Sequence, residues 1–399
     1  MKIKFNLLDT LVFLYLCSLT LVLNTPLWFL ADVLLFILLF SYLVNFYVSK
    51  RKILLTKSFL WHTIFLILSI MSVLWTKRIE IYPLFSILHI NIAILLLTNY
   101  LKNNGVNNYI SMPFFISGMI STISVWQLYG PIFLINQGTR INTAMLLNSN
   151  TYAILLLVIT LVLGSDLVFN NNSRFKNIFY VLMLINVVYQ NIFLTGSRKG
   201  LVSVGIILIF IMIYYLLINA NYLNKKTFIN LLIGTLLLLP GIFFGFRYFS
   251  ELGLFNRITN IFDFFRGQDI QEQSVYIRSR MIEIGIGLFK QRPFFGWGLD
   301  QFKYLSGYGV YSHSNYVEVL VSLGGVGLLL LYNTIFTLLN EVIKLWKFLP
   351  LKNKLMVLTI ISIVMFNDIA LVSYYDRLYW FLITFSIGLW EYFKNEELN

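Results

Sequence analysis

Two polar clusters combine basic side chains with residues that commonly begin helices. One contains Arg140 and the run Asn148-Ser149-Asn150, and the other is Thr195-Gly196-Ser197-Arg198-Lys199-Gly200. Backbone amides at a helix N-terminus favour anions, and a guanidinium presents a planar fork to phosphate oxygens. The basic residues and Asn150 are therefore candidate ligands of a phosphate-bearing substrate. Alternatively, the asparagines only cap a helix and the cations only contact lipid phosphates.

A third cluster combines arginines with a glycine-rich turn. It contains Arg278-Ser279-Arg280 and, further along the chain, Arg292-Pro293-Phe294-Phe295-Gly296-Trp297-Gly298. The glycines allow a tight backbone bend near a binding site. Arg278 and Arg280 are further candidates for contact with a phosphate. However, Arg280 and Glu283 are three residues apart and could simply pair on a helix surface.

The fourth cluster is His313-Ser314-Asn315-Tyr316-Val317-Glu318, followed by Leu323-Gly324-Gly325-Val326-Gly327. An imidazole with an ordinary pKa near 6.5 can accept a proton at neutral pH. Glu318 could orient that imidazole or pair with an arginine, and Asn315 is a candidate substrate ligand. The alternative for His313 is a polar residue that only starts a helix. His62 and His89 lie within apolar runs, where packed and hydrogen-bonded core histidines are expected.

The acidic residues do not predict a metal site. Asp32, Asp263, Asp269 and Asp300 are scattered along the chain. A metal-dependent phosphate site needs clustered oxygen ligands, whereas a metal-free site would use arginines instead. We therefore expect a metal-independent reaction without a cofactor.

The composition is that of an integral membrane protein. The 399 residues are 58% hydrophobic and only 12% charged, compared with about 25% charged in soluble domains. So few charges exclude an ordinary soluble globule, a disordered chain and a fibrous repeat. The single cysteine, Cys17, excludes a disulfide framework and a cysteine-based zinc site.

Apolar runs predict an all-α fold with twelve membrane spans. A bilayer core about 30 Å thick needs roughly 20 apolar residues per helix. The predicted spans are 7–23, 27–48, 59–75, 81–101, 110–129, 147–169, 178–194, 201–219, 228–246, 315–339, 355–372 and 378–393. The chain then divides into helices 1–9 within 1–246, a large loop at 247–314, and helices 10–12 within 315–399.

The distribution of the +13 net charge predicts the orientation. Sixteen of the thirty Lys and Arg residues lie at one set of span ends, and six lie in the opposite short loops. Cytoplasmic loops collect Lys and Arg, so both termini are expected in the cytoplasm. The loop 247–314 is then extracytoplasmic, and its eight cations are candidates for function. The basic balance therefore does not indicate a nucleic-acid partner.

Two apolar stripes at helical spacing lie within this loop. They are Ile258, Ile261, Phe262 and Phe265, and then Ile277, Met281, Ile284 and Leu288. Two short amphipathic helices near the outer leaflet would fit this pattern. A capping domain that packs on the helix bundle fits it equally well.

The four clusters, in this order, resemble the O-antigen polymerase/ligase superfamily of bacterial surface-polysaccharide enzymes, of the Wzy and WaaL types. The resemblance covers roughly residues 130–335 and includes the twelve spans and the large late loop. The sequence departs from the family in two places. Asn148-Ser149-Asn150 stands where Asn-Pro-Asn is frequent, and Ser314 separates His313 from Asn315, where the family often has the two adjacent.

The resemblance implies a membrane glycosyltransferase of the GT-C kind. Its donor would be a polyprenyl-diphosphate-linked oligosaccharide, and its acceptor a saccharide hydroxyl. The residues suit that reaction independently. Arg140, Arg198 and Arg280 could stabilise the departing diphosphate, and His313 could accept the proton of the acceptor. A flippase and a chain-length regulator are candidate partners.

Four functions remain open. A polymerase of repeat units for capsule, exopolysaccharide or O-antigen is favoured over an O-antigen ligase-type transfer of glycan to a lipid or protein. A transporter or flippase predicts ionisable residues at mid-membrane and paired halves of broken helices. The spans lack both features, apart from Asp9 and Asp368, each of which could be a buried, paired acid. A structural scaffold would leave the outer arginines unexplained.

Overall fold

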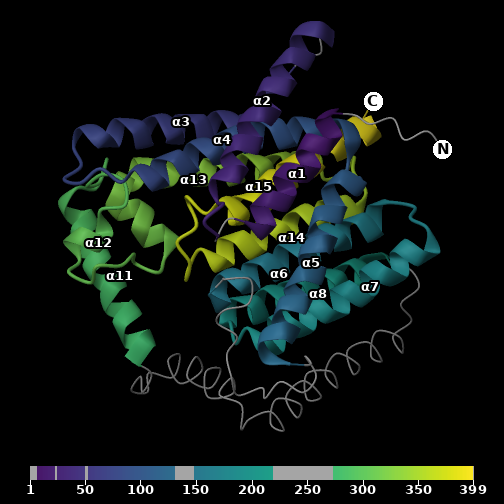
Figure 1. The fold of residues 1–399 in the computed structure, drawn as a ribbon. Coiled ribbons are helices and arrows are strands. Elements are labelled where there is room, and N and C mark those ends of the chain that lie inside the picture. Colours follow the sequence, from purple (N-terminus) through teal and green to yellow (C-terminus); the bar gives the residue numbers. More distant parts are fainter. Residues whose placement is uncertain (1–6, 23–24, 50–52, 131–147, 219–272, 399) are drawn as a thin grey trace.

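The structure is a computed structural model that describes residues 7–22, 25–49, 53–130, 148–218 and 273–398, and all elements in these ranges are helical. Figure 1 shows them as one bundle. The elements are α1 (Leu7–Leu21), α2 (Phe29–Ser49), α3 (Lys57–Met71), η1 (Ser72–Leu74), α4 (Ile81–Asn104), α5 (Asn108–Tyr129), α6 (Ser149–Phe169), α7 (Arg174–Tyr189), η4 (Gln190–Leu194), α8 (Arg198–Ile218), α11 (Gln273–Gln291), α12 (Phe302–Leu305), α13 (Asn315–Lys344), α14 (Leu351–Asn367) and α15 (Arg377–Leu398).

The all-helical prediction is confirmed for the described residues. Eleven predicted spans coincide with helices, whereas 228–246 lies outside the described residues. Eight of the described helices are long and apolar enough to cross a membrane, and α1 is apolar but shorter. The protein is therefore a multi-pass membrane protein. The total of twelve spans remains a prediction, as do the division at residues 247 and 314 and the orientation.

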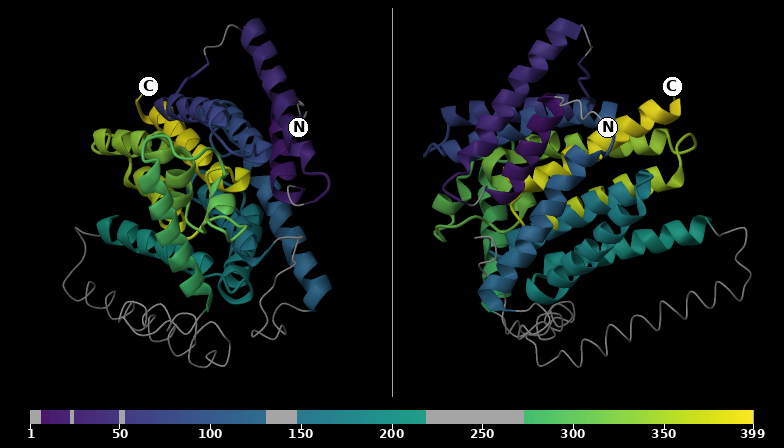
Figure 2. Two further views of the ribbon diagram at one scale, coloured as in Figure 1. Left: turned by 90° about the vertical axis from the view of Figure 1, so that its left-hand side faces the viewer. Right: turned by 45° about the vertical axis from the view of Figure 1, so that its right-hand side comes forward.

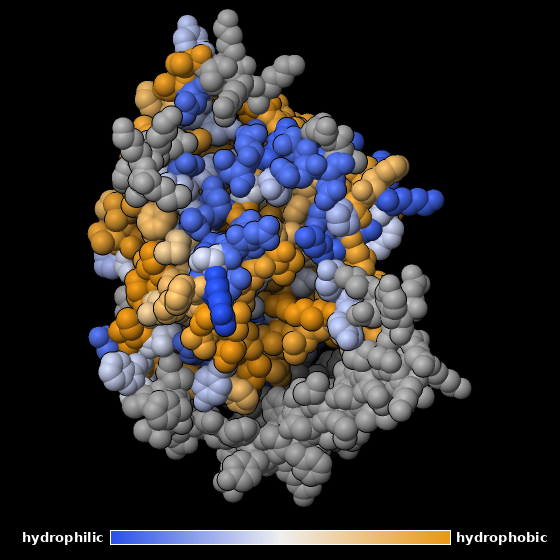
Figure 3. Space-filling view, turned by 90° about the vertical axis from the view of Figure 1, so that its right-hand side faces the viewer, coloured by the Kyte–Doolittle hydropathy of each residue, from blue (hydrophilic) through white to orange (hydrophobic). Residues whose placement is uncertain are grey.

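Helices from distant parts of the chain pack side by side in the bundle. The largest contacts join α4 to α15, α3 to α13, and α1 to α5 (Figures 1 and 2). α6 is buried along most of its length and forms much of the core. Figure 3 shows hydrophilic residues gathered at the end of the bundle where both described termini lie, with hydrophobic flanks around them. This pattern suits helix ends that leave an apolar layer.

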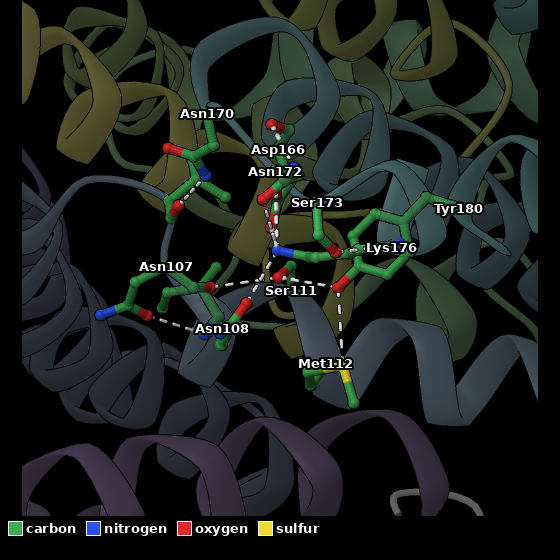
Figure 4. Close-up of polar contacts among 12 residues, drawn as sticks. Asn107, Asn108, Ser111, Met112, Asp166, Asn170, Asn172, Ser173, Lys176 and Tyr180 are labelled. Carbon is green, nitrogen blue, oxygen red and sulfur yellow. Dashed lines mark hydrogen bonds and ion pairs between the residues drawn. The ribbon is translucent and has the colours of Figure 1, made fainter. Parts of the chain in front are cut away.

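A buried ion pair ties the helix ends at this polar face. Lys176 Nζ lies 3.0 Å from Asp166 Oδ2, and the Asp166 side chain is fully buried. The same ammonium donates to Asn108 Oδ1 at 2.7 Å and to Asn172 Oδ1 at 2.9 Å (Figure 4). Buried charges need such pairing and hydrogen bonds. The cluster therefore joins α5, α6 and α7 at one end of the bundle.

At the opposite end, α13 is interrupted at Gly324, where φ is 68° and ψ is −168°. The break frees backbone groups that a continuous helix would pair, and the segment 293–298 satisfies them. The four bonds are Trp297 N to Val321 O (2.9 Å), Gly298 N to Ser322 O (2.8 Å), Gly325 N to Pro293 O (2.8 Å) and Val326 N to Phe294 O (3.2 Å). We call this arrangement, made by residues 293–298 and 321–326, the interlock.

The glycines of the interlock are required by its close backbone contacts. A Cβ atom at Gly324 would lie 2.2 Å from the carbonyl oxygen of Phe294. A Cβ at Gly296, which has φ 65°, would lie 2.5 Å from the carbonyl oxygen of Ser322. The Gly-Trp-Gly and Gly-Gly motifs are therefore two halves of one structural device.

Only the second of the two predicted apolar stripes falls in the described residues. It lies on α11, where Met281 is buried against Phe302, Val317 and Val321, and Ile277 and Leu288 pack around them. This part of the loop therefore packs against α13 at one face of the bundle, as in the capping alternative. The stripe Ile258, Ile261, Phe262 and Phe265 lies outside the described residues.

Candidate active site

His313 lies in the turn that precedes α13, and its backbone has the left-handed conformation with φ 59°. This conformation is rare for residues with a Cβ and is often kept at functional sites. The imidazole is partly buried and lies edge-on to Tyr311, with ring centroids 4.6 Å apart. Glu318 Oε2 accepts a hydrogen bond from the backbone N–H of Ser312 at 2.7 Å. Glu318 therefore orients the turn rather than the imidazole itself.

Two cations from other clusters act electrostatically on His313. Burial, with the positive charges of Arg278 and Lys199, lowers the pKa of His313 from 6.5 to about 4. Burial raises the pKa of the Tyr311 hydroxyl, and the charge of Arg278 opposes that shift. The structure thus brings together α8, α11 and the turn before α13, which the chain separates widely.

The Gly-Ser-Arg-Lys-Gly turn is built on a π-helical segment, η4, that ends α7. Gly196 adopts φ 57°, and Ser197 donates its backbone N–H to Thr195 Oγ1 at 3.1 Å. Ser197 Oγ also donates to Asn150 Oδ1 at 3.3 Å. The first two clusters are therefore adjacent. The N-termini of α6 and α8, which are the positive ends of the two helix dipoles, lie side by side.

Gly200 allows α8 to approach Asn191 closely. A Cβ at Gly200 would lie 2.0 Å from Asn191 Oδ1 and 3.2 Å from the Ala153 Cβ.

We expect Gly200→Ala to lower the free energy of unfolding by about 1–3 kcal/mol through overpacking, measured by thermal unfolding in detergent. Gly205→Ala is the matched control, because no atom lies within 4 Å of its new Cβ. Equal melting temperatures for the two variants would contradict this tight contact.

Asn315 is buried and makes four side-chain hydrogen bonds. Its amide nitrogen donates to Tyr332 and Asp368, and its oxygen accepts from the backbone N–H groups of Ser373 and Tyr374. A side-chain amide has two donors and two acceptor sites, so none is left over. Asn315 therefore anchors the start of α13, next to His313. Asp368 is a buried acid that accepts hydrogen bonds from the neutral side chains of Asn315, Tyr332 and Ser373.

The remaining predicted site residues lie in different surroundings. Arg280 is exposed, and its Nη1 lies 2.5 Å from Glu283 Oε2. The structure thus shows the surface ion pair that the sequence left open as the alternative for Arg280. Arg198 is partly buried at the first turn of α8, beside Lys199. Asn148 caps α6 by accepting from the backbone N–H groups of Asn150 and Thr151. Arg140 lies outside the described residues.

Other cations at this end of the bundle form ion pairs that join neighbouring elements. Lys303 Nζ lies 2.7 Å from Asp300 and 3.2 Å from Glu80, and Arg377 Nη1 lies 3.0 Å from Asp32. The cations at this end of the bundle therefore include a structural subset as well as the group around His313.

Residues of all but the first of these clusters fall in one segment that matches a known family. Residues 178–332 match the family model described as O-antigen ligase. This region is similar to the O-antigen polymerase/ligase superfamily. The match supports a polysaccharide-related membrane enzyme, and the family, whose members are of the glycosyltransferase type, implies a lipid-linked saccharide donor and an acceptor. A comparison with curated protein sequences finds no match.

Sequence reasoning missed two residues at this candidate site. Tyr311 packs on His313, and Asp376 stands before α15. Burial raises the pKa of Asp376, and Lys199 is among the charges that lower it. The run Tyr374-Tyr375-Asp376-Arg377 was a detectable signal, because it places two phenols and an acid next to a predicted outer cation.

Proposed function

We propose that the protein polymerises polyprenyl-diphosphate-linked oligosaccharide repeat units on the outer face of the bacterial inner membrane. The observation that carries this proposal is the convergence of Lys199, Arg278 and His313 from three sequence clusters. Two cations beside a neutral imidazole suit a reaction in which a diphosphate leaves and a hydroxyl loses a proton. The family match to residues 178–332 supports the same substrate class.

In the proposed reaction, the acceptor hydroxyl oxygen bonds to the anomeric carbon of the donor sugar while the bond from that carbon to the diphosphate breaks. His313 takes the hydroxyl proton, and the polyprenyl diphosphate leaves as an anion. Lys199 and Arg278 stabilise its charge, with Arg198, Arg280 and Arg140 as further proposed ligands. Attack opposite the leaving group inverts the anomeric centre, and no metal takes part.

To act as the base, His313 must be neutral at pH 7 and must become more basic when the donor binds. A pKa of about 4 keeps the imidazole neutral at pH 7, so that it can accept a proton. Bound diphosphate would offset the charges of Arg278 and Lys199, raise the pKa of His313 and make it a stronger base. Glu318 and Asn315 act as positioning residues, since they hold the turn and the start of α13.

We expect Arg278→Gln to move the acidic limb of the pH profile of kcat/KM to higher pH. Arg278 disfavours the protonated imidazole, so its removal raises the pKa of His313 above about 4. The measurement is the initial rate of glycan transfer between pH 3 and 8, which reports the free enzyme. Lys290→Gln is the matched control on the same helix, because Lys290 is exposed in the last turn of α11. A limb that is identical in both variants would argue against His313 as the titrating base.

A ligase is the second candidate, because the matched family is described as O-antigen ligase. An assay in which purified protein is given polyprenyl-diphosphate oligosaccharide in the presence of a chelator distinguishes the polymerase from the ligase. A ladder of chain lengths supports the polymerase, and transfer only to an added lipid or protein acceptor supports the ligase. Absence of any product from the native donor would contradict both functions.

A further inference from the structure

A groove of about 350 Å³ lies beside the interlock, next to the end of α3. Its lining residues are Trp75, Arg292, Pro293, Phe294, Phe295 and Gly296. The rings of Trp75 and Phe295 meet edge to face, with centroids 6.2 Å apart. Hydrogen bonds of the interlock hold the backbone carbonyls of Pro293 and Phe294. This wall of the groove is therefore preformed.

The groove lies where a candidate membrane span ends. Residues Lys57–Leu74 are long and apolar enough to cross a bilayer, and Trp75 follows them directly. The Leu74 side chain is 84% exposed and that of Phe294 is 71% exposed. Exposed apolar side chains at the end of a span face the lipid and its headgroup layer rather than water. The groove therefore opens toward lipid at the level of the headgroups.

Two exposed cations lie over the indole ring of Trp297, beside this groove. Arg292 Cζ is 4.1 Å from the ring centroid and Lys77 Nζ is 5.8 Å from it. An aromatic ring attracts a cation but does not neutralise its charge. Within the described ranges, no carboxylate forms an ion pair with either side chain. Two positive charges at the headgroup end of the groove thus lack a compensating anion from these ranges.

An apolar groove with two cations at its end suits an anionic lipid. An acyl chain would pack on the exposed rings, and phosphate oxygens would accept hydrogen bonds from the Arg292 guanidinium. A zwitterionic headgroup brings its own cation, which Arg292 and Lys77 repel. A headgroup that ends in an uncharged alcohol leaves the whole phosphate charge to these two side chains. Phosphatidylglycerol has this chemistry.

We propose that the groove beside the interlock binds one anionic glycerophospholipid, with its phosphate at Arg292 and Lys77 and an acyl chain along the exposed phenylalanine rings. This site is distinct from the group around His313. An α-helix rises about 1.5 Å per residue, which puts Arg278 about 20 Å from Arg292 along α11. A diphosphate bound at Arg278 does not reach Arg292, and the inference does not depend on the proposed function.

Native mass spectrometry of the delipidated full chain in detergent tests this site. The probes are dioleoyl phosphatidylglycerol and dioleoyl phosphatidylcholine, which have the same chains and differ in headgroup charge. We expect the first phosphatidylglycerol to bind about tenfold more tightly than the first phosphatidylcholine, because each cation near the membrane surface adds attraction for an anionic lipid. Equal affinities of the wild-type protein for the two lipids would overturn the proposal.

Paired charge variants assign this preference to the groove. Lys77→Gln combined with Arg292→Gln should reduce it to about twofold or less. The matched control is Lys344→Gln combined with Lys347→Gln, which removes two exposed cations near the far end of α13 and should keep the full preference. All four side chains are exposed, so both double variants should fold as the wild-type protein does. A preference that is retained in the groove variant, or lost equally in the control, would overturn the proposal.

Competition distinguishes a lipid site from a site for a free phosphate. Glycerophosphoglycerol carries the same headgroup without acyl chains. We expect an excess of it to leave phosphatidylglycerol bound to the wild-type protein, because the rings of the groove hold the chain. Displacement by glycerophosphoglycerol would overturn the proposal. Displacement by an equal amount of polyprenyl diphosphate would also overturn it, since the groove would then belong to the donor lipid.

Discussion

Replacing His313 with alanine is expected to lower the rate of glycan transfer by about 10²- to 10⁴-fold at pH 7, the usual contribution of a general base. His313 is the imidazole near Arg278 and Lys199, and the turn that carries it is held by Glu318. The proton of the acceptor hydroxyl would then have to pass to water while the diphosphate departs. The measurement is initial rate at saturating donor and acceptor.

The matched control is Tyr308→Ala, an exposed position in the same segment. We expect it to keep near wild-type turnover. We expect the melting temperatures of both variants to equal that of the wild-type protein. A His313→Ala enzyme with turnover within a few-fold of wild type would show that another group accepts the proton.

Gly324→Ala is expected to be the most damaging change in the end of the bundle that carries the interlock. The pair φ 68° and ψ −168° is accessible in practice only to glycine, and the new Cβ would lie 2.2 Å from the Phe294 carbonyl oxygen. Relief requires residues 293–298 to move off α13, which leaves buried backbone groups unpaired. Strain and lost hydrogen bonds together should lower the free energy of unfolding by about 3–6 kcal/mol.

Gly287→Ala provides the comparison for this prediction. Gly287 lies within α11, and no atom lies within 4 Å of the position that its new Cβ would take. Alanine should therefore stabilise the helix there by about 0.5–1 kcal/mol. Thermal unfolding in detergent and amide exchange of residues 293–298 measure both effects. Unchanged protection of this segment in Gly324→Ala would contradict the interlock.

Hydrophobic periodicity was enough to predict most helices. Span lengths follow from the bilayer thickness, so apolar runs mark helices such as α4 and α6 within a few residues. Pairing between helices was not predictable in this way. The contact of α3 with α13 and that of α4 with α15 depend on side-chain shape, which a run of similar apolar residues does not encode.

The types of residue in the candidate site could be predicted from the sequence. Their hydrogen bonds and orientations could not. Polar residues in an apolar chain carry a cost, which made His313 and Lys199 conspicuous. Asn315 looked like a ligand, and its four internal hydrogen bonds became visible only when Asp368 and residues 373–374 were placed beside it. The sequence favoured Arg280 over Arg278 as the arginine that stabilises the departing diphosphate. The rotation of α11 puts Arg278 near His313 and Arg280 with Glu283 on the exposed face.

The most direct test of the proposed reaction is the release of polyprenyl diphosphate by the purified protein. The enzyme is given a polyprenyl-diphosphate oligosaccharide and a saccharide acceptor, in a chelator and without added metal. We predict one polyprenyl diphosphate for each glycan transferred, with release reduced at least about a hundredfold in His313→Ala. Glycan transfer without release of polyprenyl diphosphate, or release that persists unchanged in His313→Ala, would contradict this reaction.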